Sequence, residues 1–534
     1  MDIDAQLRAA AERFNAGDLS AAKTACDAVI AYAPRQPVAL NLLALIARQI
    51  KKWGKAEEIA KAGLAANPDD PNLANTLGVV MLDQRRWQDA EEAFSRAVEI
   101  DPISPLFLSN LGRAVLRQGR QSQAREYFDR AVASDASFIP ALTGRAEVSL
   151  EVGDLDAADK DLESARAIEP NSPDVLGAQA VLELARGNLD GAYRLFDEVS
   201  STAPDGADAA VNRGLVRLMQ GNVAEGWDDY TLRRKRRWAR AFGRHETLPQ
   251  WTGGSLAGKS LLVWCEQGLG EAILGASQLA GVIAEADSVT VECDTRLTDI
   301  FARSFPDAHF LHQSDPPHAK IHDGAFDCQA AMFDLIGARA QGIAQQAPLA
   351  PYLRADASAA SDLRNKYLGE TRRNVLVGLS WGSPKALSAG QKGLAPEAWL
   401  PVFGADTAAF VNLQYGAIRA AMAAIAETAG AVWVDDSNVD PDGPLDGFAS
   451  QIAALDLVIT VSNTTAHLAG ALGVETWVLV PPPGPASMWY WFTDRTDSPW
   501  YQSVRLFRRR PGQRDAAHLE LRSALDVWLS QRSG

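Results

Sequence analysis

The residues best suited to chemistry follow a short apolar run, 457–460, that has the character of a buried strand. They carry hydroxyl, amide and imidazole groups and lead into a helix rich in alanine and glycine: Ser462, Asn463, Thr464, Thr465 and His467. Asn463 or Thr464 can cap that helix, whose free N–H groups and positive dipole end attract an anion. A single capping residue is enough to begin a helix, so the additional hydroxyl groups favour a binding site for phosphate oxygens. His467, judged by its position alone, can equally be an ordinary packed histidine.

A second polar loop follows the apolar run 261–265 and places two carboxylates around a pair of glycines. Its residues are Glu266, Gln267, Gly268, Gly270 and Glu271. The glycines let the backbone turn tightly into a helix, and a tight turn alone accounts for them. It does not account for the carboxylates, which are groups that can take a proton from a substrate. A G-x-G pattern without a third glycine is only a weak indication of a dinucleotide site.

A third loop follows the run that ends at Ser380 and Trp381. It supplies hydroxyl and ammonium donors suited to an anionic ligand, namely Ser383, Lys385 and Lys392. The two lysines can also be solvated loop residues with no ligand.

Metal-binding patterns are weak in this sequence. The acidic stretch 440–447, DPDGPLDG, suits a loop, and Pro316-Pro317 interrupts a cluster of histidines at 309, 312, 318 and 322. The four cysteines lie far apart without a C-x-x-C pair, which fits neither a zinc site nor a disulfide framework. We therefore predict no metal and no cofactor, with the cysteines as buried thiols in a reducing compartment.

The elements that position these loops are short apolar strands alternating with helical stretches, the pattern of a parallel sheet. We expect strands at 261–265, 289–293, 326–329, 375–381, 410–414, 432–434, 457–461, 477–480 and 504–506. A stretch at 337–360 rich in Ala, Gly, Pro and Gln marks a hinge. The pattern predicts two Rossmann-like α/β lobes, 256–352 and 372–534, with ligands beyond the carboxyl ends of the strands.

The first part of the chain repeats itself every 34 residues. Prolines recur at 34, 68, 102, 170 and 204, alanines at 22, 56, 90, 124, 158 and 192, and glycines at 17, 119, 153, 187 and 221, with Lys51 and Arg85 completing the glycine column. A 34-residue helix-turn-helix period is that of the tetratricopeptide repeat (TPR). We predict an all-α solenoid over 1–230, with six units and a partial seventh, in which Gly78 and Ala90 allow close helix packing and Phe94 fills the groove between units. Such arrays typically bind polypeptide, although a spacer or a dimerisation surface remains open.

A basic seam, 231–255, joins the two parts. Six basic residues lie between Arg233 and Arg240. The formal net charge of -15 opposes binding to nucleic acid, so we favour a connecting helix whose charges face acidic neighbours. The sequence also shows no basic leader at its start and no uncharged apolar run of ~18 residues, which predicts a cytoplasmic protein without a membrane span.

Several motifs together resemble a known family. They are QWTGGSLAGKSLLVWCEQGLGE, VGLSWGSPK, VNLQYG, LDLVITVSNTTAHLAGALG and WYWFTDRTDSPWYQSVRLFRR. They look like the catalytic half of bacterial TPR-containing glycosyltransferases of GT-B fold, which are similar to the heptosyltransferase-like group and to the O-linked N-acetylglucosamine transferases. The combination with a TPR array also resembles the flagellin glycosyltransferases of alphaproteobacteria, which attach nonulosonic acids such as pseudaminic acid to Ser or Thr.

The resemblance implies roles for individual residues. It places a donor phosphate at Asn463, Thr464, Thr465 and His467, with Gln414, Tyr415, Trp381 and Ser383 on the nucleotide side and the 266–271 loop facing the acceptor. This sequence departs from the family at Ser462, where an acidic residue is common, and at Glu271, where Asp is common.

We therefore expect a metal-independent, inverting transfer from a nucleotide sugar, best a CMP-activated nonulosonic acid, to Ser or Thr of a client protein such as flagellin. Glu271 or Glu266 would be the base, while Thr464, His467 and Lys392 would stabilise the leaving nucleotide. The alternatives are a UDP-hexosamine donor, a lipid or polysaccharide acceptor, and a non-catalytic TPR adaptor whose lobes sense a nucleotide sugar.

Overall fold

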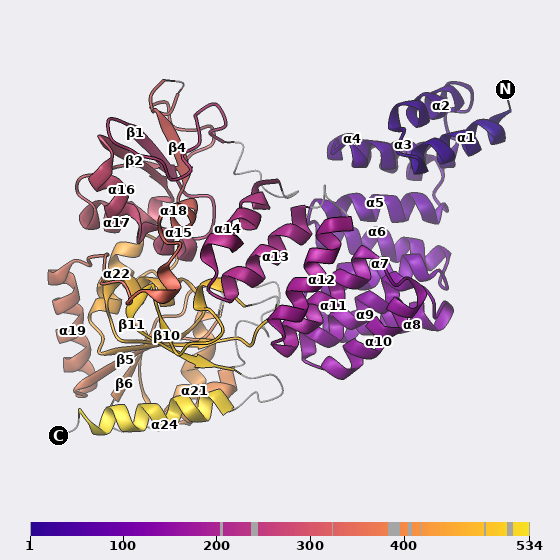
Figure 1. Cartoon of the computed structure of the whole chain (residues 1–534). Helices are drawn as coiled ribbons and strands as arrows, with labels where there is room; N and C mark the ends of the chain where they lie inside the picture. The colour runs from indigo at the N-terminus through magenta and orange to yellow at the C-terminus, as the bar shows by residue number, and fades with distance from the viewer. Residues whose placement is uncertain are drawn as a thin grey trace. The chain divides into compact units, whose positions relative to one another are not determined.

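The computed structural model describes residues 2–202, 207–235, 244–322, 324–382, 396–403, 408–416, 418–484, 487–509 and 516–532. Contacts divide the chain into two compact units, Met1–Gln179 and Ala180–Gly534. Figure 1 shows the helical first part and the mixed helices and sheets of the second.

The repeat region is built of antiparallel helix pairs with the predicted 34-residue spacing. The helices are α1 (Ile3–Asn15), α2 (Leu19–Tyr32), α3 (Pro37–Gln49), α4 (Trp53–Ala66), α5 (Pro71–Asp83), α6 (Trp87–Ile100), α7 (Pro105–Leu116), α8 (Gln121–Ser134), α9 (Ile139–Val152), α10 (Leu155–Ile168), α11 (Pro173–Arg186), α12 (Leu189–Thr202), α13 (Ala207–Met219) and α14 (Val223–Thr231). Helices α2, α4, α6 and α10 each stop two residues before a proline of the repeat, as α6 does at Ile100 before Asp101-Pro102. Helix α8 ends at the same point of its repeat, although Ala136 stands in the proline position.

The regular spacing of the glycine column has a backbone cause. Gly17, Gly119, Gly153, Gly187 and Gly221 all have φ between 78° and 85°. Glycine adopts this left-handed region without a steric penalty, so it suits the turn between the two helices of a pair. Lys51 and Arg85, which complete the column, adopt the same left-handed conformation at φ of 60°, at a steric cost that glycine does not have.

Packing between the helices also follows the prediction. A Cβ on Gly78 would lie 2.6 Å from the ring of Phe94, and both residues are buried. Only a glycine therefore lets α5 approach α6 this closely while Phe94 stays between them. Truncating such a buried phenylalanine costs about 3–5 kcal/mol.

The second unit contains two parallel sheets. The first has β1 (Ser260–Trp264), β2 (Ser288–Cys293), β3 (His309–His312) and β4 (Cys328–Ala331) in the order β3-β2-β1-β4. The second has β5 (Val375–Ser380), β6 (Ala408–Asn412), β7 (Val432–Val434), β8 (Leu457–Val461), β9 (Thr476–Val480), β10 (Asp497–Ser498) and β11 (Tyr501–Arg508) in the order β10-β11-β9-β8-β5-β6-β7. All the pairs are parallel except β10 with β11.

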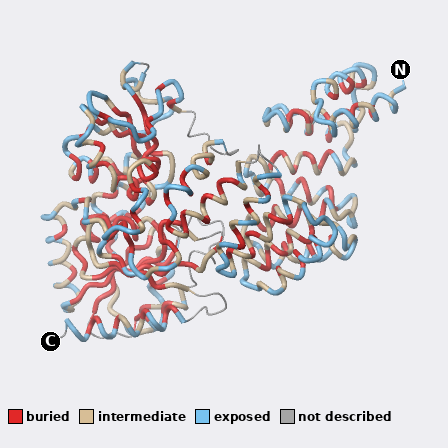
Figure 2. Tube along the Cα trace, viewed as in Figure 1, coloured by how far each residue is buried: buried red, intermediate tan, exposed pale blue. Residues whose placement is uncertain are grey.

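Helices and short 3₁₀ turns surround these sheets. They are α15 (Leu269–Ala276), α16 (Leu279–Glu285), α17 (Thr298–Ser304), α18 (Asp334–Arg339), α19 (Ala357–Thr371), α21 (Ala423–Thr428), α22 (Leu445–Ala453), α23 (Thr464–Leu472) and α24 (Ala516–Ser530), with η1 (Leu232–Lys235), η3 (Thr295–Leu297), η4 (Ile343–Gln345), η5 (Pro396–Phe403), η6 (Arg419–Met422) and η7 (Trp489–Trp491). Strands β5, β6, β8 and β9 are buried along their whole length, and Figure 2 shows this buried core in red.

Without β10, the second sheet reads β7-β6-β5-β8-β9-β11 from one edge to the other. If β5 is counted as its first strand, this is the order 3-2-1-4-5-6 of a doubly wound α/β sheet. The first sheet has the corresponding order 3-2-1-4. In such sheets the order reverses beside the first strand, and the carboxyl ends of the two strands at that point border the ligand crevice. For the second sheet these are the ends of β5 and β8, which precede Trp381 and Ser462.

Two strands differ from the prediction. β3 was not expected, because His309 to His312 was interpreted as part of a histidine cluster, and β10 was also missed. β3 is a short strand at the edge of its sheet, and its residues are exposed or half-buried. Its composition therefore does not distinguish it from a loop.

The basic seam and the last helices belong to the second unit. Trp227 of α14 is buried, and its ring lies 5.8 Å from that of Phe333 and 5.9 Å from that of Trp489. A Cβ on Gly337 would overlap the Trp227 indole at 2.0 Å. The predicted repeat region ends at residue 230, whereas the compact units divide within α11, because this aromatic packing joins the last helices to the α/β part.

Candidate functional site

The helix predicted to seat a phosphate begins as its sequence implies. Asn463 is the N-cap of α23, with an extended backbone, and its side-chain oxygen accepts from the Ala466 N–H at 3.3 Å. A Cβ on Gly470 would lie 2.6 Å from the ring of Tyr501, so the small residue lets α23 pack closely against β11. Gly473, at φ 80°, then ends the helix in a left-handed turn.

A buried hydrogen-bond network joins this cap to the ends of β5 and β6. The Asn463 amide donates to Ser380 Oγ at 2.9 Å and to the Gly382 carbonyl at 3.2 Å. Gln414 Oε1 accepts from the main-chain N–H groups of Trp381 at 2.8 Å and Gly382 at 2.9 Å. The strand ends at the switch point are therefore fixed to one another by side chains predicted to be in the site.

The predicted phosphate-binding site at the N-terminus of α23 is largely covered by other parts of the protein. Ser462, Asn463, Thr465 and His467 are all buried, and Thr464 is half-buried. Thr465 Oγ1 and Trp381 Nε1 are buried and make no hydrogen bond within the described part of the chain. A buried polar group without a hydrogen-bond partner destabilises the folded protein.

His467 is packed as an aromatic residue. Its ring stacks on Trp491 at 5.2 Å and 19°, and meets the Tyr490 ring edge-on at 4.9 Å. Nδ1 lies 2.8 Å from the Tyr501 hydroxyl. Burial lowers the pKa of His467 to about 3, so the ring is neutral near pH 7 and does not offer a positive charge to a phosphate.

Ser462 is held by the aromatic segment 489–492. Trp491 Nε1 donates to Ser462 Oγ at 2.8 Å, and both residues are buried. Burial and the nearby Glu271 carboxylate raise the pKa of the neighbouring Tyr490, so this hydroxyl stays protonated near pH 7.

The other candidate base is held by an arginine. The Glu266 side chain is 1% exposed and lies 3.3 Å from Arg233 Nη2, which also pairs with Asp334. Burial raises the pKa of Glu266, and Arg233 opposes that rise. The predicted neutralisation of the basic seam by acidic neighbours is thus present at Arg233 and at Arg234, which also pairs with Asp334.

A further buried cluster was not foreseen. Glu292, at the end of β2, has a fully buried side chain that accepts from Arg244 at 2.8 Å and lies 2.9 Å from His245 Nε2. Burial alone would raise the pKa of Glu292, but the hydrogen bonds from His245 and Arg244 outweigh it and hold the pKa below its usual value. The cluster clamps the end of the seam onto the first sheet.

The remaining predicted residues are placed as follows. Gln267 donates to the Tyr230 hydroxyl at 3.4 Å, Gly268 caps α15, and a Cβ on Gly270 would meet the His467 ring at 2.8 Å. Tyr415 is half-buried, and its carbonyl accepts from the Gln414 amide at 2.9 Å. Ser383, Lys385 and Lys392 lie outside the described residues.

Among the residues that the structure describes, no three or more His, Cys, Asp or Glu side chains come together in a group that could hold a metal ion. No helix of the described ranges is long and apolar enough to cross a membrane.

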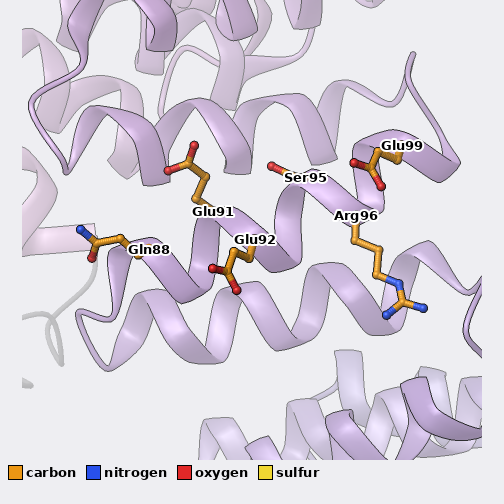
Figure 3. A pocket seen from close by; sticks show the side chains of 6 residues that line it. All are labelled: Gln88, Glu91, Glu92, Ser95, Arg96 and Glu99. Carbon is orange, nitrogen blue, oxygen red and sulfur yellow. The ribbon is translucent and has the colours of Figure 1, made fainter.

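A hollow of about 700 Å³ lies on α6 in the first unit. Figure 3 shows its polar side chains along that one helix: Gln88, Glu91, Glu92, Ser95, Arg96 and Glu99. Glu91 accepts from Arg120 and Gln118 of the next repeat, so part of this acidic surface serves packing between repeats.

Sequence reasoning missed the aromatic segment 489–492 as a part of the site. The stretch WYWFTDRTDSPWY, 489–501, contains six aromatic residues, and this density was the available signal. Tyr352 gave no such signal, because it lies in the predicted hinge and reaches the site only through tertiary contact with Tyr501.

Comparisons with known proteins concern mainly the first part. Family profiles described as tetratricopeptide repeat match residues 7–71 and 75–137, and a second such profile matches 149–218. The chain is 29% identical to Protein FlbA of Caulobacter vibrioides over 299 residues, 53% of this chain and 49% of that protein. It therefore spans about half the length of this curated relative.

Solved structures with similar folds include PilF of Pseudomonas aeruginosa, 18% identical over 38% of this chain and 92% of that one, with a TM-score of 0.33. Another is a tetratricopeptide repeat protein from Parabacteroides merdae, 16% identical over 45% of this chain and 94% of that one, with a TM-score of 0.38. Likeness at this level adds nothing to the assignment, which the profiles and the helix pairs carry. The first part of the chain is a solenoid of tetratricopeptide repeats, a scaffold that suits binding of a protein partner, and a region of parallel sheets follows it.

Proposed function

We propose that this protein is a GT-B-type O-glycosyltransferase that moves a sugar from a nucleotide sugar to Ser or Thr of a client protein recruited by the TPR solenoid. The observation that carries the proposal is the buried polar network of Ser380, Gln414 and Asn463 at the switch point of a doubly wound sheet. It lies at the N-terminus of α23, whose free N–H groups suit a diphosphate or monophosphate.

The donor and the client follow from the family resemblance. We propose a CMP-activated nonulosonic acid such as pseudaminic acid as donor and flagellin as client. A UDP-hexosamine is the alternative donor, because the same helix N-terminus would accept either nucleotide.

Glu271 is the better candidate for the base. It is half-buried in the first turn of α15, whereas Glu266 is engaged by Arg233. In the proposed step the acceptor hydroxyl gives its proton to Glu271 while its oxygen forms a bond to the anomeric carbon. The bond from that carbon to the phosphate oxygen breaks, and the nucleotide leaves toward the N–H groups of α23.

A transfer assay tests the proposal. Purified chain is incubated with flagellin and CMP-pseudaminic acid, or with UDP-N-acetylglucosamine, and the intact mass of flagellin is measured. A gain of one sugar residue that is lost in Glu271→Gln supports the proposal, and activity that survives EDTA supports its metal independence. An unchanged flagellin mass with both donors contradicts the assignment of donor and client.

The non-catalytic adaptor is retained because of one observation. The aromatic segment 489–492 covers Ser462 and His467, so the predicted seat is closed in this conformation. An adaptor would transfer no sugar, and its repeats would bind the client equally well in the parent and in Glu271→Gln.

A further inference from the structure

A cleft of about 460 Å³, lined mainly by polar side chains, lies at the end of the aromatic segment 489–492. One wall is the turn between α13 and α14, which includes Gln220, and a second wall is η4. The third wall is the chain from Phe492 to Asp497. All three walls belong to the second unit, so the cleft lies where the last repeat pair meets the α/β part.

The arginine that lines the cleft is committed to its wall. Arg495 Nε and Nη2 donate to the Asp497 carboxylate at 2.7 and 2.8 Å, and Nη1 donates to the Ala344 carbonyl at 3.0 Å. A neighbouring arginine, Arg508, donates to the carbonyls of Arg495 at 2.8 Å and Trp491 at 2.7 Å. These bonds hold the third wall together and connect it to η4, and they direct both guanidinium groups at protein oxygens.

Hydrogen-bond acceptors remain on two of the walls. Gln220 donates its amide to Asp190 Oδ1 at 2.9 Å, and its Oε1 is buried and accepts no hydrogen bond within the described part of the chain. On the third wall Asp494 is exposed, and 53% of the Asp497 side chain stays exposed although it pairs with Arg495. An unsatisfied acceptor and an excess of carboxylates favour a ligand that carries positive charge and several N–H donors.

A lysine side chain suits these acceptors better than an arginine side chain. A guanidinium group presents a planar fork that matches the two oxygens of one carboxylate, whereas an ammonium group has three donors that point in different directions. The acceptors of the cleft come from separate walls, as an ammonium group requires. The apolar stem of lysine can pack on the ring of Phe492 while its charged end reaches the carboxylates.

We infer that this cleft binds a lysine side chain of the client protein, with Asp494 and Gln220 Oε1 as acceptors. The inference rests on the proposed function for the identity of the client. Phe492 lines the cleft and directly follows Trp491, which donates to Ser462 beside the N-terminus of α23. A client bound by its lysine is therefore anchored next to the segment that covers the predicted phosphate-binding site.

Model compounds test the cleft without a client or a nucleotide sugar. The full chain is titrated with Nα-acetyl-lysine methylamide by ligand-observed NMR, and Nα-acetyl-norleucine methylamide is the uncharged control with a stem of the same length. We expect Asp494→Asn to weaken binding of the lysine compound about fivefold, the upper size of one exposed ion pair. Gln220→Met, which removes the buried acceptor, should weaken it by a similar factor.

The matched control for these variants is Asp362→Asn, at an exposed position of α19, which should bind the lysine compound as the parent does. Equal affinities of the parent for the two compounds overturn the inference. An affinity for the lysine compound that is the same in Asp494→Asn and Asp362→Asn also overturns it.

Flagellin provides the second test, in the transfer assay. Acetylation of its lysines removes their charge, whereas reductive dimethylation keeps it, so acetylation alone should raise the KM for flagellin, by about fivefold, without a change in kcat. Asp494→Lys should raise the KM for unmodified flagellin in the same way. If Asp494→Lys and the parent have the same KM, the inference fails and the proposed function stands. If the lysine compound binds as expected and neither donor is transferred to flagellin, the lysine site stands and the proposed function fails.

Discussion

Gly270 and His467 are in contact where helix α15, which follows β1 of the first sheet, meets helix α23, which follows β8 of the second sheet. A Cβ at position 270 would lie 2.8 Å from His467 Cδ2, closer than real Cβ contacts allow. The fixed ring, held between Trp491 and Tyr501, has no freedom to yield. A tight turn is one reason for a glycine at position 270. The close approach of α15 and α23 is a second reason, because it leaves no room for a side chain.

Gly270→Ala should destabilise the protein by about 1–3 kcal/mol, because the added methyl group over-packs this contact. The measurement is the midpoint of urea unfolding. Gly254→Ala is the control, since a Cβ there meets nothing within 4 Å. Equal midpoints for the two variants would show that α15 can move away from α23 at no cost.

Gln414→Leu should destabilise by roughly 2–6 kcal/mol, because it leaves the buried N–H groups of Trp381 and Gly382 without their acceptor at about 1–3 kcal/mol each. Replacing the exposed Gln345 by Leu should change stability by no more than about 0.5 kcal/mol. Chemical denaturation of the two variants makes the comparison. A Gln414 variant as stable as the Gln345 control would mean that the network at the switch point contributes nothing.

Glu292→Gln should destabilise the protein by about 1.5–3 kcal/mol at pH 7, since it removes the buried carboxylate that accepts hydrogen bonds from the half-buried Arg244. The folded pKa of Glu292 lies below its ordinary 4.5, so its stabilisation is fully present above pH 4.5 and is lost as the pH falls through the lower folded value. The difference between variant and parent should therefore shrink in acid.

Urea unfolding between pH 7 and the acid limit of the folded state tests this. Glu246→Gln, at an exposed neighbour of the same seam, should track the parent at every pH. A destabilisation by Glu292→Gln that stays constant into acid would contradict the linkage.

The sequence predicts the framework of the molecule well, for reasons that are local. Gly119 and Gly153 recur because each turn needs a left-handed residue, and the apolar runs at β5 and β8 predict strands because both are buried throughout. The sequence offers Asn463 or Thr464 as the cap of α23, and the structure has Asn463, because capping depends on residues adjacent in sequence.

The connections within the site depend on residues far apart in sequence. The ring of Tyr352 stacks on that of Tyr501, and Arg233 pairs with Glu266 and Asp334, only once the chain has folded. The exposure of His467 was likewise undetermined, since its burial comes from the aromatic segment 489–492 more than twenty residues later. Sequence pattern gives the ends of strands, whereas pairings across the fold come from tertiary packing.

The central claim is that the N-terminus of α23 binds the phosphate of a nucleotide, and Thr464→Glu tests it most directly. Thr464 is the half-buried first residue of this helix. A glutamate there should stabilise the free protein by about 0.3–1 kcal/mol through the helix dipole while repelling a phosphate, and Thr464→Gln is the uncharged control. The readout is thermal unfolding with CMP, UDP, GDP and ADP, where a ligand at ~100 times its Kd adds about 2.7 kcal/mol. We predict that CMP stabilises the parent and Thr464→Gln but not Thr464→Glu, with a UDP response indicating a hexosamine donor instead. Two results would contradict the account. One is that CMP stabilises Thr464→Glu as much as it stabilises the parent, and the other is that no nucleotide stabilises any of the three proteins.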